Sequence, residues 1–418
     1  MRQSKLFTKT RKENPTDEVS KNAELLIRGG FIHKEMAGVY SYLPLGLRVL
    51  KKIENIIREE MDAVGGQEIL MSSFQPKENW EKTGRWDTMT DLYKVSDSSN
   101  REVALGPTHE EIVVPILKNY ISSYKELPIS IYQIQNKFRM ELRAKSGMLR
   151  GREFIMKDMY SFHANHKDFK SFYEKMKDVY KNIFKRVGVG HLTYLTFASG
   201  GTFSKYSHEF QTITSAGEDT IYLDEETSTA VNHEVYNNEV LENLKLQKEK
   251  LVEHKAIEVG NIFELKTKYS EPFDLSFVDE KGKKHIILMG CYGIGLSRLM
   301  GAVVEALSDD KGIIWPESIA PFQAHLLVLG EDDDVLEEAD KVYKNLEKAG
   351  IEVLFDDRLE MSAGEKFAGA DLLGIPYRIV VSERSIKDGG VELKKRTDDE
   401  KGKIISVDEL LTLLKSSD

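Results

Sequence analysis

The stretch that decides the fold is ISIYQIQNKFRMELRAKSGMLRGREFIMKDMYSFH, residues 129–163. Its two ends, 129–139 and 153–163, are rich in Ile, Tyr, Phe and Gln, a composition typical of strands. Between them lies a loop rich in arginine, lysine and glycine. The pattern predicts an antiparallel strand pair joined by a basic loop.

The end of the first predicted strand carries side chains that suit a nucleotide. Arg139 and Glu141 are two residues apart and share a face if the strand continues through them, and Phe154 lies on the neighbouring strand. A guanidinium can bind phosphate, a carboxylate can accept from an exocyclic amine, and a ring can stack on a base. A cross-strand ion pair beside a core phenylalanine explains the same residues, and spacing alone favours that simpler reading.

The segments around this pair predict an α+β body. Apolar residues recur every three or four positions from 46 to 64, which indicates an amphipathic helix that stops at Gly65. A second such helix spans 167–187. Further segments have the composition of strands; they lie at 68–71, 103–105, 192–198, 209–223 and 284–289.

After Pro316 and Pro321 the pattern changes to alternating strands and helices, which is typical of an α/β domain with a largely parallel sheet. We therefore predict two domains, 1–322 and 323–418. Residues 225–258 are polar and are predicted to form a surface excursion with one short helix.

Composition excludes several classes of protein. The 418 residues include 59 Lys and Arg against 69 Asp and Glu, and the net charge of -10 argues against indiscriminate coating of nucleic acid. Cys291 is the single cysteine, so an intramolecular disulfide is excluded and no zinc site is expected. The sequence shows neither a membrane-spanning apolar run nor a secretory apolar core, which predicts a cytoplasmic protein without membrane partners.

The glycine-rich segments do not have the spacing of the common phosphate-binding loops. The chain has no GxxxxGK[ST] loop, and GCYGIGLSR at 290–298 lacks the spacing of a dinucleotide-binding loop. This segment predicts a strand, a glycine turn and a helix whose first turn carries Arg298. Tight packing of the glycines with a solvent-exposed arginine explains it equally well.

A third segment, Thr108 to Glu111, has two compatible interpretations. Thr108 and Glu111 have the spacing of a capping box at a helix start. Glu110 is not needed for the cap, and a carboxylate there could bind a buried ammonium group.

Together these motifs resemble the class II aminoacyl-tRNA synthetases, and specifically the bacterial type of prolyl-tRNA synthetase. The matching stretches are SKLF (4–7), YLPLG (42–46), GPTHEE (106–111), KFRME (137–141), MKDMYSFH (156–163), SHEF (207–210), GCYGIG (290–295) and GIIWP (312–316). In the C-terminal domain they are FDDR (355–358), GEKF (364–367) and IPYR (375–378). The resemblance implies an antiparallel-sheet catalytic domain followed by an α/β anticodon-binding domain.

The resemblance implies ATP and Mg²⁺ as requirements, with zinc absent. It assigns Arg139 and Arg298 to phosphate, Glu141 and Phe154 to adenine, and Arg139 also to the amino-acid carboxylate. Further ATP contacts are expected from Glu209 and Gln211, with Glu209 the candidate magnesium ligand. Proline is expected to contact Thr108, Glu110, Asp158, Tyr160, His163 and Cys291.

The same resemblance implies contacts with tRNA(Pro). The acceptor end is expected at Arg143, Lys145 and Arg150, and the anticodon at Asp357, Arg358, Glu365, Lys366 and Phe367. The first class II motif, formed by the helix at 46–64 and the segment up to Pro76, implies a homodimer.

The leading hypothesis is an ATP-dependent ligase that forms prolyl adenylate and esterifies tRNA(Pro). The alternative is a catalytically inactive, synthetase-like regulator that binds tRNA. Loss of Arg139, Glu141 or Arg298 would favour that alternative, but all three are present. Relatives often carry an editing domain where this chain has only residues 225–258, so we expect no editing in cis and correction by a separate protein or tolerance of the error.

Overall fold

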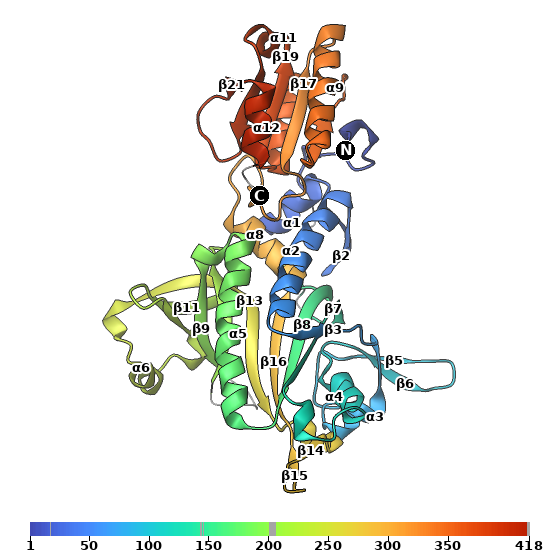
Figure 1. Cartoon of the computed structure of the whole chain (residues 1–418), viewed down its shortest axis with the longest axis vertical. Helices are drawn as coiled ribbons and strands as arrows, with labels where there is room; N and C mark the ends of the chain where they lie inside the picture. The colour runs from blue at the N-terminus through green and yellow to red at the C-terminus, as the bar shows by residue number, and fades with distance from the viewer. Residues whose placement is uncertain (17, 143, 145, 200–205, 416–418) are drawn as a thin grey trace. The chain divides into compact units, whose positions relative to one another are not determined.

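The computed structural model describes the chain (Figure 1) except residues 17, 143, 145, 200–205 and 416–418. Arg143 and Lys145, which were predicted to contact tRNA, therefore lie outside the described residues. Within the described residues, no helix combines the length and apolar character needed to span a bilayer.

The chain divides into two compact units. The first comprises Met1–Lys34, Ser41–Lys52 and Val303–Asp418, and the second comprises Glu35–Tyr40 and Ile53–Ala302. The sequence predicted a single division between residues 322 and 323, whereas the first unit also includes the N-terminal segment. Met1 explains part of this grouping, because its ammonium group donates to the carbonyl of Val353 at 2.7 Å.

The described part of the second unit is built on a nine-stranded sheet in the order β10-β9-β12-β11-β13-β16-β8-β7-β3. Its strands are β3 (Gly66–Glu68), β7 (Ile129–Phe138), β8 (Glu153–His163), β9 (Thr193–Ser199), β10 (Tyr206–Ile213), β11 (Asp219–Asp224), β12 (Thr229–Asn232), β13 (Leu251–Lys266) and β16 (Leu288–Gly295). The predicted antiparallel pair is confirmed: β7 and β8 pair from Ile129 opposite Phe162 to Phe138 opposite Glu153. The segment at 209–223, predicted as one strand, forms parts of two strands, β10 and β11.

The predicted surface excursion at 225–258 is too long. Residues 229–232 form β12, and residues 251–258 begin β13, which pairs with β16. Between these strands lies α6 (Asn238–Leu244), whose Val240 and Leu241 pack with Val231 in a small apolar cluster. The stretch outside the sheet is therefore limited to residues 233–250.

One face of the sheet is covered by α5 (His166–Val187), the helix predicted at 167–187 (Figure 1). Tyr180 and Phe184 of this helix pack so closely on β13 that a Cβ on Gly260 would lie 3.1 Å from each ring. A larger residue at this position would push the helix off the sheet.

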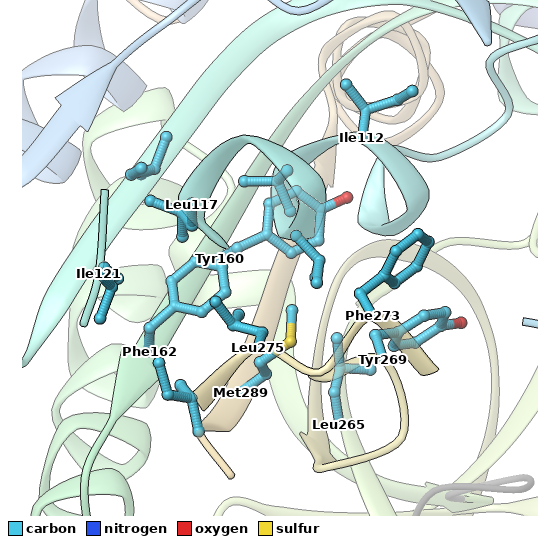
Figure 2. Close-up of a cluster of buried hydrophobic side chains, with 14 of the residues drawn as sticks. Ile112, Leu117, Ile121, Tyr160, Phe162, Leu265, Tyr269, Phe273, Leu275 and Met289 are labelled. Carbon is cyan, nitrogen blue, oxygen red and sulfur yellow. The ribbon is translucent and has the colours of Figure 1, made fainter. Parts of the chain in front are cut away.

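The opposite face packs against α4 (Glu110–Lys118) and α7 (Ser270–Phe273). Figure 2 shows Tyr160 and Phe162 of β8 and Met289 of β16 in one buried cluster with Leu117 of α4 and Phe273 of α7. This cluster fixes α4 over the sheet, so the residues at its N-terminus have a defined position.

Other helices and strands before residue 307 lie outside the nine-stranded sheet and the helices described above. They are α1 (Lys21–Arg28), β1 (Ile32–Met36), β2 (Val39–Tyr42), α2 (Pro44–Ala63), β4 (Phe74–Pro76), α3 (Lys77–Lys82), β5 (Tyr93–Ser96), β6 (Glu102–Leu105), β14 (Ser276–Val278), β15 (Lys284–Ile286) and α8 (Leu296–Ala306). Helix α2 is the helix predicted at 46–64, and Gly65 after it has the positive φ of 84° that a glycine stop requires. The strand predicted at 68–71 is wrong in position, because β3 spans Gly66–Glu68 and overlaps the prediction at Glu68 alone.

The C-terminal part of the first unit contains a five-stranded sheet in the order β18-β17-β19-β20-β21, as far as the described residues extend. Its strands are β17 (Ala324–Leu329), β18 (Val353–Asp356), β19 (Tyr377–Ser382), β20 (Val391–Lys395) and β21 (Lys403–Ile405). Its helices are α9 (Asp333–Lys348), α10 (Ala363–Leu373), α11 (Glu383–Lys387) and α12 (Val407–Lys415). The first three strands are parallel, which confirms the predicted α/β pattern.

Lys157 gives a testable consequence of the packing under α5. It is fully buried, and its Nζ donates to Tyr180 Oη at 2.8 Å and to the carbonyl of Tyr292 at 3.0 Å. Burial lowers the pKa of Lys157 from 10.5 to about 7. The unfolded chain therefore binds one more proton than the folded chain between these two pH values, so this residue makes stability rise with pH across that window.

We expect Lys157→Met to remove this contribution. The free energy of unfolding of the variant minus that of the parent should fall steadily from pH 7 to pH 10, measured by urea unfolding. A difference that stays constant with pH would mean that Lys157 remains charged in the folded protein.

Candidate active site

A row of residues crosses the face of the sheet opposite α5. Gln133, Asp158, Gly293, Asn261 and Glu209 lie directly opposite one another on five successive pairing strands. Residues paired in this way point to the same side of a sheet. Glycine suits position 293 in the middle of the row. A Cβ there would lie 2.9 Å from the side-chain oxygen of Asn261, which is closer than real Cβ contacts.

A cleft of about 580 Å³ opens beside this row. Its charged lining residues are Arg139, Glu141, Arg150, Glu258 and Arg298, and the other residues that line it are Met148, Leu149, Gly151, Phe154, Met156, Val259, Gly260, Asn261, Gly293 and Gly295. Four of the residues predicted to bind ATP therefore line one cavity. Those four are Arg139, Glu141, Phe154 and Arg298.

The two arginines are held in different ways. The guanidinium of Arg139 lies 5.1 Å above the Phe154 ring, and its buried Nε has no hydrogen-bond partner within the described residues. Arg298 donates from Nε to the carbonyl of Leu149 at 2.7 Å and pairs with the Glu258 carboxylate at 3.2 Å. Burial, and then the nearby charge of Arg298, lower the pKa of Arg139. Two cations converging on one cleft are suited to a polyanion.

The route by which Glu141 reaches the cleft differs from the prediction. Strand β7 ends at Phe138, so Arg139 and Glu141 do not share a strand face. Instead the backbone N–H of Glu141 donates to the Arg139 carbonyl at 2.7 Å in a tight turn. Arg150 Nε then donates to Glu141 Oε2 at 2.8 Å.

The predicted glycine turn at 290–295 is also wrong. These residues continue as strand β16 up to Gly295, and α8 begins at the next residue. The glycines thus keep the face of the sheet open, and Arg298 lies in the first turn of α8 as predicted.

An acidic group lies at the far end of the row. Gln211 Nε2 donates to Glu209 Oε2 at 3.0 Å and to Asp219 Oδ2 at 2.8 Å. Burial, and then the charge of Glu258, raise the pKa of Glu209 to about 8. The described residues contain no group of three His, Cys, Asp or Glu side chains arranged to hold a metal. One or two carboxylates are enough for Mg²⁺ when phosphates supply the other ligands, so the donor set fits such an ion.

Most of the residues expected to contact proline meet at the start of α4. Thr108 Oγ1 donates to Glu110 Oε2 at 2.5 Å, and the Cys291 thiol lies 3.8 Å from Glu110 Oε1. Tyr160 Oη donates to Asp158 Oδ2 at 3.1 Å. Thr108 Oγ1 lies 3.4 Å from Tyr160 Oη, so the side chains of Thr108, Glu110, Asp158, Tyr160 and Cys291 form one connected group.

The predicted capping box is wrong. The N-cap residue of α4 is His109, whose side chain makes no capping hydrogen bond. Glu111 instead accepts hydrogen bonds from Thr83 at 2.9 Å and from Arg85 at 3.0 Å. Glu110 therefore does not share these partners fully, and the Arg85 guanidinium at 3.6 Å is a weaker ionic neighbour for it.

His163 is not part of this group. It lies five residues after Asp158 on β8, and an odd spacing places the two side chains on opposite faces of the sheet. Its Nδ1 lies 2.5 Å from Asp168 Oδ2, and its ring packs on Phe169 and Phe172 of α5. The assignment of His163 to the amine site is therefore corrected, and the period of two in β8 would have excluded it.

The structure adds residues that the sequence did not single out. Lys137 and Gln133 contact Asp158, Arg85 faces Glu110, and Glu258 and Asn261 line the cleft. Lys137 and Gln133 lie at even spacings from each other on β7, which was the only available signal. Glu258 lies within the segment interpreted as a surface excursion.

The predicted anticodon residues lie around α10. Lys366 Nζ donates to the carbonyl of Val328 at 2.7 Å, and Arg358 Nη2 forms a buried ion pair with Asp356 at 2.7 Å. Asp357 accepts from Ser4 at 2.9 Å, and Glu365 forms a capping box with Ser362. These four side chains have partners within the unit.

Phe367 lies beside a different pair of residues. The guanidinium of Arg378 is 4.6 Å from the Phe367 ring centre and pairs with Asp371 at 3.2 Å. Arg378 and Asp371 line a cavity of about 730 Å³ together with His325 and Lys394. Phe367 contacts this arginine but is not among the residues that line the cavity. An arginine fork and a carboxylate at one cavity are suited to an unpaired base.

Comparisons with known proteins agree with this geometry. Residues 93–307 match the family described as tRNA synthetase class II core domain (G, H, P, S and T), and residues 320–417 match the family described as anticodon binding domain. The proline–tRNA ligase of Wolbachia sp. subsp. Drosophila simulans (strain wRi) is 41% identical over 408 residues, which cover 95% of each chain. That of Exiguobacterium sibiricum is 35% identical over 556 aligned positions, covering 98% of each.

Among solved structures, the prolyl-tRNA synthetase of Cryptosporidium parvum, complexed with halofuginone and AMPPNP, has a similar fold. Its TM-score is 0.78 at 19% identity, and the match covers 95% of this chain and 77% of that one.

Proposed function

Because this chain belongs to the prolyl-tRNA synthetase family of class II aminoacyl-tRNA ligases, it catalyses prolyl-tRNA aminoacylation, and we propose that it does so through a prolyl adenylate. ATP is the second substrate of this class. In the first step a carboxylate oxygen of proline attacks the α-phosphorus of ATP and displaces pyrophosphate. In the second, a hydroxyl group of the terminal tRNA ribose attacks the acyl carbon, loses its proton and displaces AMP.

The observation that carries the proposal is the pair of arginines in the cleft beside Phe154. Arg139 would bind the α-phosphate and the proline carboxylate, and Arg298 would bind the γ-phosphate. Such a reaction depends on positioning and charge stabilisation more than on a general base. Preorganised guanidiniums supply both, because their places are fixed before the substrate arrives.

The other ATP contacts follow from the same cavity. Phe154 would stack on adenine, and Glu141, oriented by Arg150, would accept from the adenine amino group. Glu209 and Gln211 would lie toward the phosphates, with Glu209 a ligand of Mg²⁺ when the ion is bound. A bound Mg²⁺ supplies charge neutralisation on the phosphate oxygens.

Proline would bind at the start of α4. The Thr108 hydroxyl and the Glu110 carboxylate would accept from its protonated secondary amine, because a buried ammonium group needs charged or hydrogen-bonding partners. Asp158, Tyr160 and Cys291 would surround the ring. The buried apolar cluster that includes Tyr160 and Cys291 would limit the size of this proline site.

Amino-acid-dependent exchange of pyrophosphate into ATP tests the adenylate step. Across the twenty amino acids, proline should give the strongest exchange. A folded protein that gives no proline-dependent exchange in the presence of Mg²⁺ would instead support the alternative of an inactive tRNA-binding regulator.

We further propose that Arg143, Lys145 and Arg150 contact the acceptor end of the tRNA, since the sequence between β7 and β8 is basic and Arg150 lines the cleft. Charge reversal at Arg143 should then slow aminoacylation far more than pyrophosphate exchange. Equal losses in both assays would assign this arginine to the adenylate site or to the fold.

We propose that residues 323–418 form the anticodon-binding domain and that the cavity beside Phe367 binds an anticodon base. The anticodons of proline tRNAs contain two guanines. An arginine can donate to guanine O6 and N7, and a carboxylate can accept from its N–H groups. Phe367 would act through Arg378, whose guanidinium lies 4.6 Å from its ring centre. Asp357, Arg358, Glu365 and Lys366 would then shape the surface around this cavity.

Arg378→Ala tests this role. Loss of one base-reading arginine costs about 1 to 3 kcal/mol, so kcat/KM for tRNA charging should fall roughly 10- to 100-fold while pyrophosphate exchange is unchanged. Lys341→Ala, on the exposed side of α9, is the matched control. Unchanged charging by the Arg378 variant would remove this cavity from anticodon recognition.

We propose that the enzyme is a cytoplasmic homodimer that forms through the first class II motif. Leu70 and Phe74, which follow α2 and β3, are 76% and 62% exposed. Large apolar side chains left at the surface favour contact with another protein, here a second copy. Sedimentation of the double variant Leu70→Asp/Phe74→Asp should give a monomer, and an unchanged dimer would place the interface elsewhere.

We also propose that the chain does not edit alanyl-tRNA. The alignment with the Exiguobacterium relative extends over 556 positions although this chain has 418 residues, so that relative contains residues without a counterpart here. In this chain the stretch 233–250 adds only α6 and its small cluster. So few buried side chains cannot form an independent hydrolytic domain.

Alanine is smaller than proline, so the pocket rejects it only through missing apolar contacts, worth about 1 to 3 kcal/mol for each methylene. We therefore expect measurable alanyl adenylate formation and no deacylation of alanyl-tRNA with the proline anticodon, leaving correction to a separate editing protein or to tolerance. Hydrolysis well above the spontaneous rate would show that residues 233–250 do more than we propose.

A further inference from the structure

Lys137 is a buried lysine that the proposed chemistry does not use. It lies on β7 two residues before Arg139, and its side chain is fully buried. Its Nζ lies 2.6 Å from Asp158 Oδ1 and 2.8 Å from His109 Nδ1. Lysine is rarely buried completely unless it is paired, so these two contacts explain its position.

The contact with His109 fixes the tautomer of that ring. An ammonium group only donates hydrogen bonds, so His109 Nδ1 must be the acceptor. The proton then resides on Nε2, which lies 3.1 Å from the carbonyl oxygen of Ser72 and donates to it. Burial, and then the charge of Lys137, lower the pKa of His109 to about 4, which agrees with a neutral ring.

The contact with Asp158 leads to the same residue by a second route. Asp158 Oδ2 accepts from Tyr160 Oη at 3.1 Å and from Gln133 Nε2 at 3.1 Å. Tyr160 Oη in turn accepts from the backbone N–H of His109 at 3.1 Å. Lys137 therefore acts on His109 through its ring and, by way of Asp158 and Tyr160, through its backbone.

His109 is the N-cap of α4 and lies between Thr108 and Glu110, which are hydrogen-bonded to each other. The His109 side chain makes no capping hydrogen bond to this helix, so the conformation of the N-cap depends on the strand residues that contact it. Lys137 also offsets the charge of Asp158. Glu110 is then the carboxylate of this group that remains available to a cationic substrate.

We propose that Lys137 is a positioning residue for amino-acid activation, which locks His109 and Asp158 so that Thr108 and Glu110 face the substrate amine. The inference rests on the proposed proline site at these two residues. It goes beyond that site because Lys137 lies behind Asp158 and His109 and acts only through them.

The test compares three variants in pyrophosphate exchange: Lys137→Met, Asp158→Asn and the double variant. Lys137→Met should raise KM for proline about tenfold or more, since a misplaced contact group has effects of this size, while KM for ATP stays within about twofold. The double variant removes the buried carboxylate that the single variant leaves unpaired. The factor by which the double variant raises KM for proline should therefore be clearly smaller than the product of the factors for the two single variants.

Lys157→Met is the matched control. Lys157 is also fully buried, and it lies next to Asp158 in sequence, but its side chain contacts Tyr180 and the Tyr292 carbonyl on the opposite face of the sheet. This control should change stability and leave KM for proline unchanged. A rise in KM for proline equal to that of Lys137→Met would overturn the inference, because it would show a general effect of losing a buried lysine.

Two other results would overturn the inference. One is an unchanged KM for proline in Lys137→Met, and the other is a double variant whose rise in KM for proline equals the product of the two single rises. If Lys137→Met does not fold, the double variant decides, and its KM for proline should be raised while KM for ATP is not. Wild-type KM in that variant would refute the role of Lys137. Absence of exchange by the parent enzyme would refute the proposed function instead, so the two failures are distinguishable.

Discussion

Replacing either Arg139 or Arg298 by alanine is expected to lower proline-dependent pyrophosphate exchange at least about a hundredfold, the typical effect of removing one preorganised charge donor. Both guanidiniums line the same cleft, and Arg139 has a buried nitrogen without a partner in the described part of the chain. A phosphate or carboxylate oxygen would satisfy that nitrogen. The loss should therefore appear in the chemical step rather than in folding.

The two variants should differ in which kinetic constants change. Arg139 is assigned to both substrates, so its variant should raise KM for proline as well as lower kcat, whereas the Arg298 variant should leave KM for proline unchanged. Arg186→Ala on α5 is a suitable control, because Arg186 pairs with Glu60 at 2.8 Å and does not line the cleft. Binding of tRNA should survive in all three. Exchange within tenfold of the parent for Arg139→Ala would contradict its assigned role.

The parts of the fold that sequence predicted well are those with a strong local pattern. The β7–β8 pair, helix α5 and the C-terminal alternation of strands and helices all follow from periodicity and glycine stops. Strand β13 was missed because its first residues are polar and exposed, and it becomes a strand by pairing with β11 and β16. Such long-range pairing leaves little trace in local composition.

In the candidate site, too, local patterns indicate some residues, whereas others depend on contacts between distant parts of the chain. The resemblance to the synthetase family makes Arg139, Arg298 and Phe154 candidates, although the spacing of Arg139 and Phe154 alone favours an ion pair beside a core phenylalanine. All three line the cleft. The burial of Lys137 could not be predicted from the sequence. It depends on His109 and Asp158, which lie on other elements and offset the free-energy cost of burying the lysine charge. Local rules also failed where the chain departs from regular geometry, as at Glu141, which a turn brings to the cleft after β7 has ended.

The second large effect is expected at Glu110. Glu110→Gln keeps the size of the side chain and an oxygen for the Thr108 hydroxyl, but removes the negative charge that would face the proline amine. Truncating one partner of a buried, hydrogen-bonded charge pair costs about 2 to 5 kcal/mol, which corresponds to a rise in KM for proline of roughly thirtyfold to several thousandfold. KM for ATP should change little, because Glu110 does not line the cleft that contains Arg298.

Glu111→Gln is the closest control for that prediction. Glu111 is the next residue of α4 and is also buried, but it accepts from Thr83 and Arg85 rather than from Thr108. Burial raises the pKa of Glu111 to about 7, so a neutral side chain there is a smaller change. We expect the Glu111 variant to affect KM for proline much less than the Glu110 variant does. Equal effects on KM would mean that the two carboxylates act together through Arg85, and that Glu110 does not bind the amine on its own.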